Sequence, residues 1–307
     1  MDQLLALRTF LRIAEAGNFS KAADQLNLPR STASKLIQDL EEHLGTRLIH
    51  RTTRRTTVTP EGAQYYERAL RLVAELEDMD AEAGRSRAQP KGRLRVDVGS
   101  VLANLILVPA LPDFRARYPD IDLYLGVSDR QADMVGEGID CVIRGGELAE
   151  TSLIARKLCE LEMVVCAHRS YVAQHGLPRH PRELESGHRL VAYFSSLSGR
   201  SFPMLFQREG EEVEVDTAGH WAVNESTAHA GALIAGLGIG QNFRFALQRH
   251  LDSGELVPVL PDWSQPRFPM YVMYPPNRHL NGKARVFVDW AVELFAAYDA
   301  RPRLDVY

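Results

Sequence analysis

Six polar side chains near the N-terminus share one face of a predicted helix whose opposite face is apolar. They are Arg30, Ser31, Thr32, Ser34, Lys35 and Gln38. Guanidinium, ammonium, hydroxyl and amide groups at the start of a helix are the groups that contact base edges and phosphates in the major groove of DNA. The acidic residues Asp39, Glu41 and Glu42 come later in the segment, away from that contact. The pattern predicts a nucleic-acid recognition helix.

A basic stretch follows this helix and extends the same chemistry. Residues 46–60 read TRLIHRTTRRTTVTP, in which threonine and valine favour a two-stranded wing. The arginines Arg51, Arg54 and Arg55 suit contact with phosphates or with the minor groove. Residues 30–60 hold six Lys or Arg against three Asp or Glu, a local charge of +3 in a chain of net charge −4. A solvated basic loop would show the same charges, but its position after three short helices favours DNA binding.

Three short helices are expected to hold these side chains. Apolar residues at three- and four-residue spacing predict the first helix over residues 3–16. The second opens on Ser20 as its N-cap, which makes Ser20 a further candidate for DNA contact. The third has Pro29 in its first position, runs to about Leu44 and ends at Gly45 as a left-handed cap. This order of elements predicts a helix-turn-helix.

The segment after the wing predicts one long helix with a narrow apolar seam. Its seam residues repeat at four- and three-residue spacing and are Tyr65, Ala69, Leu72, Leu76 and Met79. A helix of about 22 residues is roughly 33 Å long, and such a seam favours pairing with a second copy of the chain. The alternative is a single helix packed on its own domain.

The remainder of the chain, after a polar hinge, alternates strand-like and helix-like segments, which predicts βαβ units and a mostly parallel sheet. A second run of the same kind begins near residue 162, and the last strand and helix are expected to return to the first lobe. The expected boundaries are 1–60 for the winged helix-turn-helix domain, 61–84 for the linker helix, 85–92 for the hinge and 93–307 for the two-lobed domain, with lobe I at about 93–161 and 266–307 and lobe II at about 162–265.

Ligands of open α/β sheets bind at the carboxyl ends of the strands, which here predicts a cleft between the lobes. The polar or aromatic residues at the predicted strand ends are Ser100, Ser128, Arg144, Gly145, His168, Ser195, Ser196, Phe202 and Asn224. An arginine, several hydroxyls and the free N–H groups of a helix beginning near Ala103 suit a small carboxylate. For each residue a loop or capping role is the alternative, and Arg144 could instead pair with Glu147.

The glycine, histidine and cysteine patterns of the second domain do not predict a functional site. The glycines at 236, 238 and 240 follow a predicted helix instead of a strand, so they do not match a dinucleotide fingerprint. The histidines at 175, 180 and 188 lack metal-ligand spacing, so no metal site is expected. The cysteines at 141, 159 and 166 lie in apolar runs and are expected to be buried thiols, with a redox sensor as the alternative. No catalytic constellation and no cofactor site emerge.

Length and hydropathy limit the class of protein. The 307 residues are 45% hydrophobic, enough for more than one packed core. No run of 18 apolar residues occurs, and the N-terminus begins with a polar-capped helix. We therefore expect neither a membrane span nor a signal peptide, and a cytoplasmic location.

The residues of the head resemble those of the LysR-type transcriptional regulators. The similarity covers LRTFLRIAEAGNFSKAADQLNLPRSTASKLIQDLEEHLGTRLIHRTTRRTTVTPEGAQYYERA and continues through GRLRVDVGS and GALIAGLGIG in the second domain. It implies an all-α winged helix-turn-helix with a long linker helix, followed by an α/β, two-lobed, periplasmic-binding-protein-like (type 2) effector domain. It also implies that Ser100, the strand end at Arg144 and residues 195–202 contact an effector. One departure is Pro29-Arg30-Ser31, where many members have Ser-Gln-Pro.

The resemblance leads to one hypothesis with two rivals. The hypothesis is a regulator, not an enzyme, that binds double-stranded promoter DNA as a homodimer or homotetramer, responds to a small-molecule effector and contacts RNA polymerase. The first rival is an α/β transferase or hydrolase with a helical appendage. The second is a transport receptor, which the DNA-reading head argues against.

Overall fold

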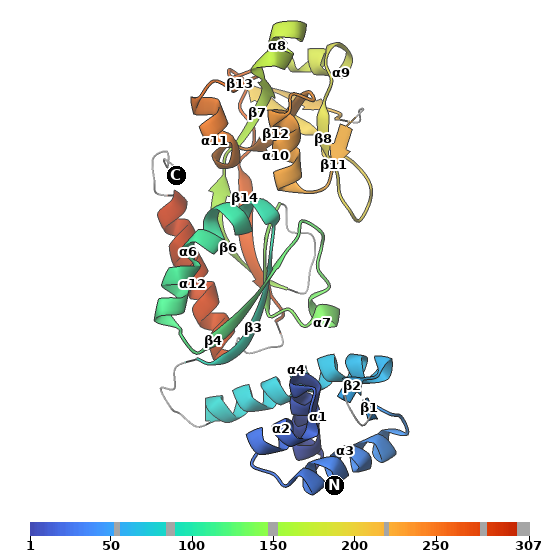
Figure 1. The fold of residues 1–307 in the computed structure, drawn as a ribbon. Coiled ribbons are helices and arrows are strands. Elements are labelled where there is room, and N and C mark those ends of the chain that lie inside the picture. The colour runs from blue at the N-terminus through green and yellow to red at the C-terminus, as the bar shows by residue number, and fades with distance from the viewer. Residues whose placement is uncertain (52–55, 84–89, 147–152, 218–220, 277–280, 300–307) are drawn as a thin grey trace. The chain divides into compact units, whose positions relative to one another are not determined.

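The computed structural model describes residues 1–51, 56–83, 90–146, 153–217, 221–276 and 281–299 (Figure 1). The chain divides into two compact units, Met1–Gln89 and Pro90–Tyr307. Within the described ranges, no helix combines the length and the apolar character that crossing a membrane requires.

The first unit begins with the three expected helices, α1 (Gln3–Ala16), α2 (Phe19–Gln25) and α3 (Arg30–Leu44). Two details of their starts differ from expectation. The N-cap of α2 is Asn18, whose side-chain oxygen accepts from the Ser20 amide at 2.8 Å, so Ser20 lies inside the helix. Pro29 is the N-cap residue of α3 and makes no side-chain capping bond, because proline has neither a polar side chain nor an amide hydrogen.

The wing consists of β1 (Ile49–Arg51) and β2 (Thr56–Val58), which pair antiparallel. The long helix α4 (Pro60–Ala83) follows directly. Thr59 fixes this junction, because its hydroxyl donates to the Arg47 carbonyl at 2.7 Å and accepts from the Gly62 amide at 2.9 Å. Gly62 is required here because a Cβ would lie 2.1 Å from the Leu48 carbonyl oxygen.

The core of the first unit joins all four helices to the wing. Phe10 of α1 and Ile37 of α3 are fully buried, and Leu48 and Ile49 seal the core from the wing side. From α4, Ala69 is buried in the same cluster. The first half of α4 is therefore anchored to the head that it follows in sequence.

Lobe I of the second unit is built on a five-stranded sheet in the order β4-β3-β5-β14-β6. Its strands are β3 (Gly92–Val98), β4 (Ile121–Val127), β5 (Cys141–Gly145), β6 (Ile154–Leu161) and β14 (Phe268–Tyr274). β3 runs parallel to both β4 and β5, whereas β14 is antiparallel to β5 and β6. The expectation of a mostly parallel sheet is thus wrong for this edge, because β14 returns from lobe II and enters at the end where its neighbours leave.

The helices of lobe I lie against this sheet. They are α5 (Ser100–Leu102), the π-helical turn η1 (Ala103–Leu107), α6 (Val108–Arg117), α7 (Met134–Glu137) and α12 (Gly282–Asp299). The first three wind continuously, so the helix expected near Ala103 begins at Ser100. α6 and α12 lie side by side (Figure 1), with Phe114 and Trp290 ring centroids 5.0 Å apart.

Lobe II holds shorter sheets around a second core. Its strands are β7 (Met163–His168), β8 (Val191–Tyr193), β9 (Met204–Arg208), β10 (Glu211–Val215), β11 (Trp221–Val223), β12 (Ile239–Phe243) and β13 (Leu256–Pro258). Its helices are α8 (Arg169–His175), η2 (Pro181–Glu183), α9 (Leu184–Gly187), α10 (Ser226–Ile234) and α11 (Arg244–Asp252). β12 and β13 flank β7, and β9 and β10 form an antiparallel hairpin.

Candidate DNA-reading surface and interlobe site

The helix α3, the predicted recognition helix, has its polar residues on the side opposite its buried face. Ala33, Ile37 and Leu40 are fully buried and hold one face of the helix in the core. On the opposite face Arg30, Ser31, Thr32, Lys35 and Gln38 are exposed, and Ser34 is half-buried. Ser20 of α2 is also half-buried. The first three turns of α3 therefore offer cations, hydroxyls and an amide to a partner.

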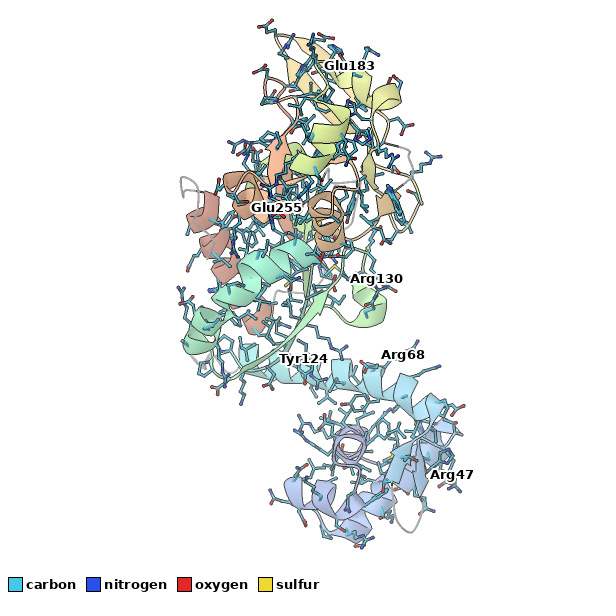
Figure 2. All side chains as sticks on the ribbon, turned by 45° about the horizontal axis from the view of Figure 1, so that its top comes forward. Arg47, Arg68, Tyr124, Arg130, Glu183 and Glu255 are labelled. Atoms are coloured by element: carbon cyan, nitrogen blue, oxygen red, sulfur yellow. The ribbon has the colours of Figure 1, made fainter. Side chains whose placement is uncertain are left out.

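The cations on the exposed face of α3 are not neutralised by neighbouring acids of the described chain. Within the described part of the chain, Arg30 and Lys35 form no ion pair. Arg47 (Figure 2) is likewise exposed and lies directly before the wing, although the sequence reasoning only counted its charge and did not assign it to the site. Of the three predicted wing arginines, Arg54 and Arg55 lie outside the described residues, and so does the side chain of Arg51.

An acidic residue of α3 fixes the wing. One carboxylate oxygen of Glu41 accepts from the Leu48 amide at 2.9 Å and from the Ile49 amide at 3.0 Å. These amides belong to buried residues at the start of β1, where water cannot replace the acceptor. Glu41 thus joins α3 to the wing, which is a structural reason for an acid at this position.

The predicted dimer seam of α4 divides between two environments. Ala69 is buried and Tyr65 half-buried against the core of the head, and burial raises the pKa of Tyr65. Leu72, in contrast, is 57% exposed, and Leu76 is half-buried. The side chain of Met79 lies outside the described residues.

In the second unit, the start of α5 meets the start of α10 where the lobes join. The hydroxyls of Ser100 and Ser226 lie 2.9 Å apart, and the Val101 amide donates to the Ser226 hydroxyl at 3.2 Å. Both serines are buried. Asp129, in the loop after β4, accepts from the Ser100 amide at 2.7 Å and from its hydroxyl at 3.0 Å. The amide expected to be free for a ligand is therefore occupied by a side chain of the protein.

Arg144 is also engaged within lobe I. Its guanidinium forms an ion pair with Asp97 on the neighbouring strand β3 and donates to the Arg130 carbonyl at 3.2 Å. Burial raises the pKa of Asp97 more than the charge of Arg144 lowers it. The alternative partner Glu147 lies outside the described residues. Arg130 lies beside α7 (Figure 2), where it forms an ion pair with Glu137 at 2.9 Å.

His168 does not belong to the interlobe site. β7 follows directly on β6 of lobe I, so its carboxyl end points to the outer end of lobe II (Figure 1). There the His168 ring accepts from the Ser170 amide as the N-cap of α8, and its Nε2 lies 3.9 Å from Glu255. The expectation that every strand end faces the cleft is wrong for β7, because this strand begins at the crossing instead of ending there.

The other candidates serve mainly local structure. The Ser128 hydroxyl accepts from the Arg130 amide at 3.0 Å, and the Ser195 hydroxyl accepts from the amides of the two residues after Ser196 at 3.3 Å each. Ser196 is exposed. A Cβ on Gly145 would meet the Phe268 ring at 2.3 Å, so this position admits only glycine without rearrangement.

The predicted residues Asn224 and Phe202 of lobe II both lie near Tyr193, which contacts lobe I. The Tyr193 hydroxyl donates to Asp129 at 3.1 Å and to the Asn224 carbonyl at 3.4 Å. The Tyr193 ring also lies 6.1 Å from that of Phe202, which is 55% exposed. Burial raises the pKa of Tyr193, so its hydroxyl remains a donor.

Buried hydrogen bonds connect α10 to the strands β8 and β12. The Nε2 of His229 donates to the Val191 carbonyl at 2.9 Å, and its Nδ1 accepts from the Asn242 side-chain amide at 3.1 Å. Asn242 also donates to the Ser226 carbonyl at 3.1 Å. Burial lowers the pKa of His229, which favours the neutral ring, and burial likewise lowers the pKa of His188 elsewhere in lobe II.

The sequence reasoning missed Asp129, Tyr193 and Ser226, which together with Ser100 form one hydrogen-bonded contact between the lobes. Each lies within a few residues of a predicted candidate, so chain proximity was the available signal. A hollow of about 300 Å³ in lobe I, lined by Arg95, Asp97, Tyr124 and Glu137 among others, contains none of the nine predicted residues.

A winged helix-turn-helix unit followed by a two-lobed α/β unit defines a class of DNA-binding regulators with a separate ligand-binding domain. Residues 4–63 match the family described as bacterial regulatory helix-turn-helix protein, lysR family, and residues 87–296 match the LysR substrate binding domain. The chain therefore belongs to the LysR family of DNA-binding transcriptional regulators, which are not enzymes.

Relatives along the whole chain agree with this assignment. The chain is 39% identical over 296 residues to an HTH-type transcriptional repressor of Pseudomonas aeruginosa, covering 96% of this chain and 93% of that protein. It is also similar to the solved structure of CrgA, a LysR-type transcriptional regulator from Neisseria meningitidis, at 30% identity and a TM-score of 0.59 over 95% and 98% of the two chains. The full-length structure of AphB, a virulence activator of Vibrio cholerae, gives 29% identity and a TM-score of 0.59 over 94% and 98%.

Proposed function

We propose that this protein regulates transcription by placing the exposed face of α3 in the major groove of promoter DNA while the wing contacts the backbone. The observation that carries the proposal is the pair Arg30 and Lys35, two exposed cations without an ion pair in the described chain, at the start of a helix anchored by Ile37. The N-terminal residues of a recognition helix are the ones that reach base edges. Gln38 extends the same face toward a third base.

A second copy of the chain would complete the DNA-binding form. Leu72 is 57% exposed on α4, although its neighbours Ala69 and Val73 are buried in the head. An exposed leucine on a long helix is a suitable contact for the same helix of a second subunit. Two heads related by a two-fold axis would read an inverted repeat. A pair of such dimers would give the tetramer, and contact with RNA polymerase from that assembly would take place in the cytoplasm.

The two-lobed unit would act as the sensor. Lobes I and II meet through Ser100 and Ser226, so a small molecule bound at this junction would change how the lobes are held. Such a ligand can shift the regulator only if it binds the two arrangements of the lobes with different affinity. The junction is built from helix starts and hydroxyls, which suits recognition of a small polar molecule.

The DNA-binding proposal is tested by replacing Arg30 and Lys35 with alanine together. A DNA site is first selected from a random-sequence pool with the full-length protein, and affinity is then measured by fluorescence anisotropy at several salt concentrations. We expect a loss of about tenfold to several hundredfold for the selected site, since a base contact contributes roughly 1–3 kcal/mol. The salt dependence should become less steep, because fewer counterions are released.

The matched control removes two exposed arginines from the second unit, Arg115 and Arg182, by the same substitution. This control lowers the net charge equally but leaves α3 intact. We expect the control to lose little affinity. Equal losses in the two double variants would mean that α3 acts only through the overall charge, and the proposed recognition surface would be wrong.

A further inference from the structure

One carboxylate connects the two lobes of the second unit. Asp129 of lobe I accepts from the Ser100 amide and hydroxyl with its Oδ1 atom, at 2.7 and 3.0 Å. Its Oδ2 atom accepts across the junction from the Ser226 amide at 2.5 Å and from the Tyr193 hydroxyl at 3.1 Å. Both oxygens are therefore engaged, and two of the four donors belong to the other lobe.

The Asp129 carboxylate accepts the hydrogen bonds that a bound anion would accept at this position. An ionised carboxylate has about four acceptor positions, and here four donors converge on Asp129. Two of them are first-turn amides of α5 and α10, groups that have no partner inside their own helices. The hydroxyl contact between Ser100 and Ser226 closes the same junction.

Among the described residues, the charged groups around the junction are already engaged. Arg144, the cation predicted to receive one, is already paired with Asp97. Glu225 adds a further negative charge beside α10, where its carboxylate accepts from the Thr227 amide at 3.0 Å and the Ala228 amide at 2.6 Å. The junction thus has its donors satisfied and its cation neutralised by the protein's own acids.

We propose that Asp129 is an internal ligand that holds the lobes together in the absence of an effector and excludes external carboxylates from the junction. A free carboxylate competes for the same donors with a group that is tethered to the protein, which gives Asp129 the advantage of a high effective concentration. An effector that acts at the junction must displace Asp129 or bind around it. The inference rests on the proposed function only in treating the two lobes as the sensor.

The test removes the internal carboxylate and supplies an external one. In full-length Asp129→Ala protein, sodium formate is titrated against sodium chloride at equal ionic strength, and thermal unfolding and hydrogen exchange of the Ser226 amide are followed. We expect exchange at Ser226 to become roughly 10- to 100-fold faster, as for loss of a hydrogen bond to a charged acceptor. Formate should then raise the Tm of the variant and slow this exchange, while it leaves the wild type unchanged.

Asp133→Ala is the matched control, because Asp133 is also a lobe I carboxylate and accepts from the Gly136 amide at 2.9 Å. Formate should not restore this variant. The proposal is overturned if Ser226 exchange is unchanged by Asp129→Ala, if formate fails to restore that variant, or if formate stabilises the wild type equally.

A variant of the same size covers the case in which Asp129→Ala does not fold. In Asp129→Asn only one side-chain oxygen remains as an acceptor, so exchange at Ser226 should rise, and unchanged exchange would overturn the proposal. Neither readout uses DNA or a natural effector. Failure of the proposed regulation would therefore appear in DNA binding and leave these measurements as they are.

Discussion

The link between the recognition helix and the wing provides a quantitative prediction. In Glu41→Ala, the amides of Leu48 and Ile49 lose an acceptor that lies 2.9 and 3.0 Å away. Both residues are fully buried, so water does not take its place without disturbing the core. The wing should therefore loosen at its first strand, next to the face of α3 that we propose contacts DNA.

The size of this effect follows from the acceptor's charge. A hydrogen bond to a charged group contributes about 1.5–3 kcal/mol, and Glu41 is half-buried, so we expect Glu41→Ala to lower the free energy of unfolding of the head by about 2–4 kcal/mol. For a unit of this size that corresponds to a fall in Tm of roughly 10–20 °C. Glu41→Gln keeps a neutral acceptor and should cost about 1 kcal/mol.

The assay is thermal unfolding of the full chain, with hydrogen exchange at Leu48 and Ile49 to locate the change. Glu42→Ala is the matched control, since this neighbouring acid is exposed and removal of such a surface charge alters stability by about 0.5 kcal/mol or less. If Glu41→Ala is no more destabilising than Glu42→Ala, or if the two wing amides remain protected, the reasoning about the carboxylate is refuted.

Three further predictions concern packing, pairing and pH. Gly62→Ala should destabilise the head by roughly 1–3 kcal/mol in denaturant unfolding, because the new Cβ would meet the Leu48 carbonyl. Gly231→Ala, with open space around it, should be neutral or stabilising by up to about 1 kcal/mol, and the opposite order would contradict the packing. Leu72→Asp should weaken self-association in sedimentation experiments more than Leu177→Asp, another exposed leucine, and equal effects would argue against pairing through α4. Because burial lowers the pKa of His229, the unfolded chain binds protons more readily than the folded one, so the free energy of unfolding should fall as the pH drops through about 6.5. His229→Gln should flatten this slope of up to about 1.4 kcal/mol per pH unit. An unchanged slope would show that other groups cause it.

The head was the part of the fold that sequence reasoning described well, because its signals are local. Helix spacing, the left-handed glycine at position 45 and the threonine-rich wing all act within a few residues, and the observed helices α1 and α3 match them. The capping residue of α2 was misplaced by two positions because Asn18 and Ser20 are both good caps. The prediction of a mostly parallel sheet in lobe I is wrong because alternation along the chain does not show that a strand returns from the other lobe. β14 does so, and it runs antiparallel to both neighbours.

The amino-acid sequence by itself determined the class of protein, the exposed face of α3 and the residues near which the lobes meet. Only the tertiary structure decided how those residues are used, since hydrogen bonds between distant segments have no periodicity in the sequence. Asp129 and Ser226 are 97 positions apart, and the carboxylate that joins them also occupies the Ser100 amide, which had been expected to await a ligand. Likewise Arg144 finds Asp97, 47 positions away, on the neighbouring strand. Burial makes each such donor costly to leave unpaired, so the fold supplies acceptors from the chain itself.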